Sequence, residues 1–170
     1  MFEKIRKMKN QKGFTLVELI VVLVILAILA AMLVPALTGY IDKANDQKIV
    51  AATRQVVMAA QTEISEAYGK GKLENTSVTI EDGKVKQDPD KDTNITGEAI
   101  VKLAEVGDLS GAGSTYKLKN GISKIEITYT AKGHVSKVVL TQNTKTCTYV
   151  EDVKDIPDDS TYKSGNYGVK

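Results

Sequence analysis

The residue whose chemistry most needs an explanation in this sequence is Glu18. It lies at the start of an apolar run, which Leu19 to Val34 continue without one polar side chain. A carboxylate inside a span that enters lipid costs about 2.5–3.5 kcal/mol on insertion scales. Glu18 is therefore expected to have a function. The simplest expectation is that it pairs with a cationic group, because pairing offsets the cost of burying a charge.

The apolar run around Glu18 is long enough to cross a membrane. From Phe14 to Leu37 it covers about 24 residues, and a helix needs about 20 to cross the hydrocarbon core. The segment before it carries five basic residues and one acid, which predicts a cytoplasmic N-terminus. A secretory signal peptide is the alternative, but its apolar region is shorter and ends in an Ala-x-Ala-like site, which is absent here.

The motif Lys12-Gly13-Phe14-Thr15-Leu16-Val17-Glu18-Leu19, between a basic leader and a long apolar run, resembles the type IV prepilin signature. The resemblance implies that a membrane peptidase cuts between Gly13 and Phe14 on the cytoplasmic side. It also implies N-methylation of Phe14 and makes Glu18 the acid of the motif. Glycine suits such a cut because its backbone is unhindered. The detailed resemblance covers about the first 65 residues.

After such a cut, Phe14 would carry an amine that stays cationic when methylated. Glu18 lies one helical turn away, at the i, i+4 spacing. We hypothesise that Glu18 meets the Phe14 amine of a neighbouring subunit during assembly, which offsets the desolvation of the carboxylate. One alternative is that Glu18 pairs with the Phe14 amine of its own chain. Another is that the chain has an ordinary signal anchor, near whose end the Glu18 side chain reaches water.

One long helix is expected from Phe14 to about Tyr68, in two halves. Residues 14–38 form a membrane-spanning or filament-core half, and residues 39–68 an amphipathic half. A bend is expected at Pro35, with Gly39 one turn later; alternatively, Pro35 ends the membrane helix and a second helix begins. The amphipathic half repeats apolar residues at steps of three, four or seven, which place them on one helix face: Ile49, Val56, Ala60, Ile64 and Ala67. The first half has no domain to pack on, which predicts lipid or other copies of the chain around it.

The rest of the chain predicts an α+β fold, in which the second half of the helix packs on an antiparallel sheet of about four strands. Residues 69–115 are expected to form a connecting loop with a short hairpin at Asp82-Gly83 and a short helix. The sheet is expected at 116–150, where apolar residues alternate with polar ones and Asn120-Gly121 is a strong hairpin turn signal. Residues 151–170 are expected to be an irregular surface tail, with Tyr162 and Tyr167 against the sheet.

Few residues point to catalysis, metal binding or nucleic-acid binding. The alternation of Asp88, Asp90, Asp92 and Asn94 is similar to the start of a calcium-binding loop, but the later ligand positions do not match. His134, the only histidine, stands in a predicted turn. Without its leader the chain keeps 18 basic and 20 acidic residues, so no basic field favours nucleic acid. These observations predict no enzymatic activity and no cofactor.

The single cysteine, Cys147, excludes a disulfide within the chain and is expected to be a small buried apolar residue. Many pilins of Gram-negative bacteria have a C-terminal disulfide, so its absence favours a Gram-positive pilin of clostridial type.

The resemblance implies a structural subunit of a type IV pilus that serves adhesion, motility, aggregation or DNA uptake. Its partners would be copies of itself, the prepilin peptidase and methyltransferase, and an assembly platform with its ATPase. The precursor would be a single-pass membrane protein and the mature form part of an extracellular pilus. A pseudopilin of a type II secretion or competence system is the main alternative. A DNA-binding subunit at a pilus tip and a monomeric anchored surface domain are further ones.

Overall fold

The computed structural model describes residues 13–71, 73, 76–81, 84–87, 95, 97–109 and 116–170. The chain divides into two compact units, with the boundary between Lys43 and Ala44. Helix α2 (Leu16–Gly69) begins in the first unit and ends in the second. It continues through Pro35 without interruption, so the alternative of two separate helices is wrong.

In the first unit, every described residue of 13–43 is exposed, although most of the side chains are apolar. Pro35 lies inside the helix and lacks the N–H that would bond to the carbonyl one turn earlier. Its own carbonyl accepts a hydrogen bond from the Thr38 hydroxyl at 2.9 Å. A bend at Pro35 and Gly39 stays a prediction.

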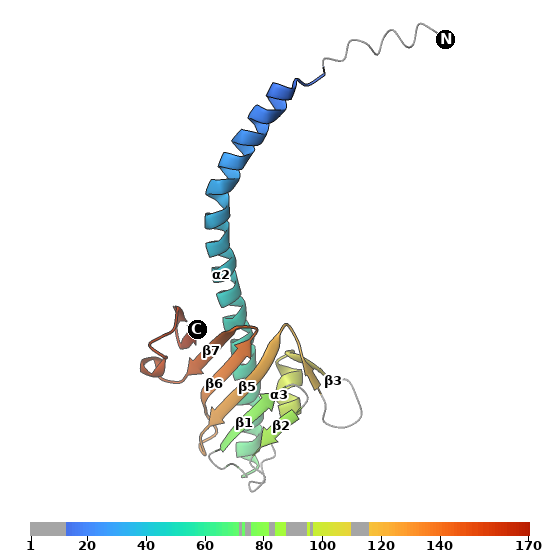
Figure 1. The fold of residues 1–170 in the computed structure, drawn as a ribbon. Helices are drawn as coiled ribbons and strands as arrows, with labels where there is room; N and C mark the ends of the chain where they lie inside the picture. The colour runs from blue at the N-terminus through green and yellow to red at the C-terminus, as the bar shows by residue number, and fades with distance from the viewer. Residues whose placement is uncertain are drawn as a thin grey trace, which may run out of the picture. The chain divides into compact units, whose positions relative to one another are not determined.

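The second unit contains an antiparallel sheet of seven strands in the order β2-β1-β5-β6-β7-β9-β8 (Figure 1). The expectation of about four strands was therefore too low. The predicted hairpin at Asp82-Gly83 is confirmed by the pairing of β1 with β2. The strands are β1 (Thr76–Glu81), β2 (Lys84–Gln87), β5 (Ile122–Tyr129), β6 (Val135–Gln142), β7 (Lys145–Val150), β8 (Tyr162–Ser164) and β9 (Tyr167–Val169).

The strand expected from Tyr116 to Leu118 exists, but it does not belong to this sheet. It is β4 (Tyr116–Leu118), which pairs with β3 (Gly107–Leu109) in a separate two-stranded sheet. Strand β5 pairs with β1 on one side and β6 on the other, so it has no free edge for β4. The turn at Asn120-Gly121 thus joins two sheets instead of forming a hairpin. The predicted short helix is present as α3 (Gly97–Leu103).

Residues 151–170 are more ordered than the expected irregular tail. A short 3₁₀ helix, η2 (Val153–Asp155), is followed by β8 and β9, and β9 pairs with β7 in the main sheet. Tyr167 and Val169 are buried on β9, while Tyr162 is half-buried. The expectation that both tyrosines lie against the sheet is confirmed; the irregular conformation is corrected, because β7 offers an edge that β9 completes.

The core of the second unit lies between the sheet and the C-terminal half of α2, which passes behind β1, β5 and β6 in Figure 1. The predicted stripe of Ile49, Val56, Ala60, Ile64 and Ala67 is buried. It packs with the inward residues of the strands, among them Ile80, Ile125, Ile127, Val138 and Leu140.

Polar contacts join the same helix to the turn between β5 and β6. The Gln61 amide donates to the carbonyl of Gly133 at 2.6 Å and accepts from the N–H of Val135 at 2.9 Å. One side chain thereby satisfies a backbone donor and a backbone acceptor, which buried or half-buried backbone requires.

Candidate processing and assembly site

The predicted cleavage site lies just outside the first turn of α2. Gly13, Phe14 and Thr15 have no regular secondary structure, and the helix begins at Leu16. Among the described residues, no atom other than those of Gly13 and its chain neighbours lies within 4 Å of the place that a Cβ on Gly13 would occupy. Phe14 is 77% exposed. The predicted site is thus non-helical and exposed, which favours access by a peptidase.

Thr15 and Glu18 form a capping box at this helix start. The N–H of Glu18 donates to the Thr15 hydroxyl at 3.3 Å, and the N–H of Thr15 donates to Glu18 Oε2 at 3.5 Å. The Thr15 carbonyl accepts the first helical bond, from Leu19 N–H at 3.3 Å. Two backbone donors that the helix cannot satisfy are satisfied by these side chains.

The role of Thr15 was missed in the sequence analysis, although a signal for it was present. Threonine followed three residues later by glutamate, just before an apolar run, is the pattern of a capping box. Glu18 thus has a local role as part of the capping box, in addition to being an acid at the start of an apolar run.

Glu18 makes no ion pair with any basic side chain in the described part of the chain, and its second carboxylate oxygen, Oε1, makes no hydrogen bond there. The acid is held in its own chain through one oxygen only. Pairing of Glu18 with a Phe14 amine, in the same chain or in a neighbour, stays a prediction.

The helix behind this site is long and apolar enough to cross a membrane. Its exposed large side chains run from Leu16 to Ile41, and none of that surface is covered by the described residues of the first unit. Monomeric soluble proteins rarely expose contiguous apolar patches larger than a few hundred Å². The exposed run is therefore a surface for lipid or for other apolar helices.

Comparison with protein families finds the prokaryotic N-terminal methylation motif at residues 8–34. These residues include the non-helical segment at Gly13–Thr15, the capping box and most of the apolar run. This motif supports a type IV pilin-like prepilin. It implies processing by a prepilin peptidase and assembly at a membrane, and type IV pilin-like proteins are structural and typically not enzymes. No curated protein and no solved structure matches the chain.

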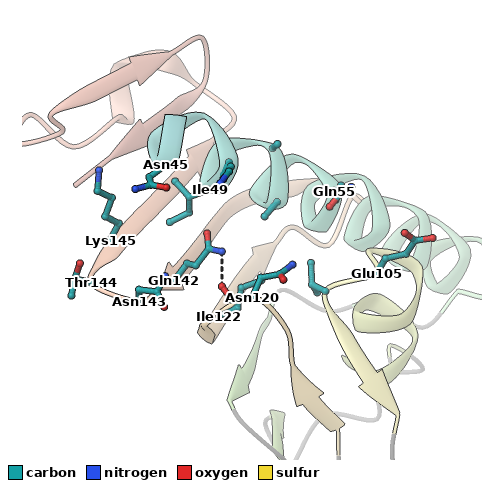
Figure 2. A pocket seen from close by; sticks show the side chains of 14 residues that line it. Asn45, Ile49, Gln55, Glu105, Asn120, Ile122, Gln142, Asn143, Thr144 and Lys145 are labelled. Carbon is teal, nitrogen blue, oxygen red and sulfur yellow. Dashed lines mark hydrogen bonds between the residues drawn. The ribbon is translucent and has the colours of Figure 1, made fainter. Parts of the chain in front are cut away.

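A second candidate site is a groove of about 660 Å³ in the second unit (Figure 2). It lies between α2, the segment before β3, the turn before β5 and the turn after β6. Lys145 at one end pairs with Asp46 at 2.5 Å, and Gln142 donates to the Asn120 carbonyl at 2.7 Å across the floor. Its lining is rich in amides and contains neither histidine nor cysteine: Asn45, Lys48, Ile49, Ala51, Ala52, Gln55, Glu105, Val106, Asn120, Ile122, Gln142, Asn143, Thr144 and Lys145. This lining can form hydrogen bonds with a ligand, but it supplies no nucleophile paired with a base.

The remaining predicted residues add no catalytic set. His134 lies in the turn between β5 and β6, is exposed, and accepts a backbone hydrogen bond from Thr130 N–H at 2.9 Å. Asp88, Asp90, Asp92 and Asn94 lie outside the described residues. Among the residues that the structure does describe, no three of His, Cys, Asp and Glu are grouped to hold a metal.

Cys147 is fully buried on β7, as expected. Burial raises the pKa of its thiol to about 11, and a hydrogen bond with Thr53 of α2 lowers it in part. Thr53 is itself buried, and its hydroxyl donates to the Ile49 carbonyl at 2.8 Å within the helix. Because the nucleophilic form of cysteine is the thiolate, Cys147 is an inert packing residue at neutral pH.

The raised pKa of Cys147 predicts a dependence of stability on pH. Between the unfolded pKa of 9.0 and the folded value of about 11, the unfolded chain loses the thiol proton more readily. The stabilising contribution is therefore complete below pH 9 and is lost as the pH rises to 11, by about 2–3 kcal/mol. Urea unfolding at pH 8 and pH 11 checks this. The Cys147→Ala variant is the control, because its stability should fall by less over the same range; an equal fall in both proteins would contradict the assignment.

Proposed function

We propose that this chain is a pilin, a structural subunit that polymerises into a type IV pilus. The observation that carries the proposal is the exposed apolar half of α2, most of which lies within the methylation motif. The described residues of the first unit leave this surface exposed, and outside a membrane such a surface favours contact with other copies of the chain. Lipid and a bundle of identical helices are both apolar surroundings for this surface. The precursor can therefore be inserted in the membrane, and the mature subunit can move from there into a filament core.

In this proposal, residues 1–13 form a leader that is removed between Gly13 and Phe14. The new Phe14 amine is methylated and stays cationic. Glu18 of one subunit then pairs with this amine in a neighbour, which offsets the cost of placing the carboxylate among apolar helices. Two observations support such a contact: Oε1 of Glu18 makes no hydrogen bond among the described residues, and Phe14 is exposed. The second unit, residues 44–170, would form the filament surface.

A pseudopilin of a secretion or competence system is the second candidate, because it shares the same motif and helix. Long surface fibres distinguish the two. If deleting this chain removes long fibres from the cell surface in electron micrographs, the pilin is supported. If fibres persist while export or DNA uptake stops, the pseudopilin is supported.

Mass spectrometry of the native protein tests the processing step directly. The mature chain should lack residues 1–13 and begin with Phe14, with a mass increase of about 14 Da for one methyl group. As a control, Gly13→Val places a branched side chain next to the predicted scissile bond and should leave the precursor uncut. Native assembled material that still carried its first thirteen residues would overturn the proposal.

A further inference from the structure

The segment around the predicted cut lies outside the helix, because α2 begins only at Leu16. Thr15 and Glu18 exchange two hydrogen bonds, at 3.3 and 3.5 Å, and Leu16 is the first helical residue. Phe14 and Leu19 stand at the two positions where a hydrophobic staple commonly flanks a capping box. The polar pair and the two flanking apolar residues together form a complete signal for a helix start, immediately after Gly13.

We propose that Thr15 is a positioning residue for processing: its capping box with Glu18 makes α2 begin at Leu16 and so keeps the Gly13–Phe14 bond outside the helix, where the peptidase can reach it. This inference rests on the proposed cut between those residues. Peptide bonds inside a helix are hydrogen-bonded within it and are poor protease substrates, whereas bonds in extended exposed segments are readily cut.

Loss of the cap acts on the first turn of α2. Without the Thr15 hydroxyl, the N–H of Glu18 has no acceptor, and unsatisfied backbone donors are especially costly next to lipid. The helix can then lengthen towards Gly13, or the first turn can open. Either change moves the scissile bond relative to the apolar helix that anchors it. Loss of a threonine cap shifts the equilibrium between the capped helix start and these altered conformations by about fivefold.

The capping role of Glu18 needs a hydrogen-bond acceptor and not a charge. Glutamine also serves at this position of a capping box. Glu18→Gln should therefore keep the helix start and the cut, even though it removes the charge that the proposed assembly contact needs. The two roles of one side chain can thus be separated by substitution.

The test measures the rate at which the full-length precursor in membrane vesicles is cut by the purified prepilin peptidase of the same source. Thr15→Val keeps the side-chain shape but removes the hydroxyl, and should slow the cut about fivefold. Thr15→Ser and Thr15→Asn keep a capping side chain and should be cut within about twofold of the natural rate. Secondary chemical shifts of Gly13–Glu18 in micelles report whether the helix start has moved.

The outcomes separate the inference from the proposed function. Equal rates for Thr15→Val and the natural chain would overturn the positioning role. A Thr15→Asn rate as low as that of Thr15→Val would also overturn it, because the peptidase would then recognise threonine itself. If the natural chain were cut elsewhere or not at all, the proposed function would fail, and the inference with it.

Discussion

Filaments are expected to be lost when Glu18 is replaced by glutamine, while the variant still reaches the membrane and is cut. Glutamine keeps the size and the capping ability of the side chain but cannot form an ion pair with the Phe14 amine. Removing one partner of a buried ion pair costs about 3–5 kcal/mol, which weakens each subunit contact more than a hundredfold. Counting fibres in electron micrographs and measuring the sheared surface protein check this result.

The control for this experiment is Glu66→Gln on the same helix. Glu66 is exposed and pairs with Lys70 at 2.7 Å, one turn away. An exposed pair of this kind adds little to stability, so this variant should form filaments at the natural level. Normal filaments from Glu18→Gln would contradict the proposed contact between subunits, whereas equal loss in both variants would mean that the assay responds to any lost acid.

Replacement of Ile64 by alanine is expected to cause a large loss of stability in the second unit. Ile64 is fully buried between α2 and the sheet. Truncating a buried isoleucine to alanine typically costs 2–5 kcal/mol, because apolar contacts are lost and a cavity remains. The melting temperature of the full chain in detergent, followed by tyrosine fluorescence, should fall by roughly 10 °C.

Met58→Ala is the matched control, since Met58 lies on the same helix and is 58% exposed. Its truncation should change the free energy of unfolding by no more than about 0.5 kcal/mol. If Ile64→Ala were as stable as Met58→Ala, the helix would not be held by the sheet in the way the structure describes.

Local patterns were sufficient for the elements that neighbouring residues specify. The apolar run and the spacing of Ile49, Val56, Ala60, Ile64 and Ala67 predicted one long helix with a buried stripe, because helical periodicity depends only on nearby residues. The same holds for the hairpin of β1 and β2 and for the methylation motif. The capping box of Thr15 and Glu18 was also within reach of the sequence, since its whole signal lies within four residues.

Thr53 shows where a polarity pattern alone is insufficient. Thr53 stands at a position of the buried stripe, but a pattern that counts only apolar residues does not predict its burial, because its hydroxyl is polar. In the structure Thr53 is fully buried, because its hydroxyl donates to the Ile49 carbonyl within the helix and satisfies itself locally.

Sequence alone thus determined the apolar helix, its amphipathic second half and the motif at its start. Only the tertiary structure decided which strands are neighbours: β4 pairs with β3 instead of β5, and β9 completes the edge of β7. It also decided the groove, whose lining comes from α2 and from turns far apart in the chain. The physical reason is that strand pairing depends on which edge is left open after the other strands have paired, and no short stretch of sequence contains that information.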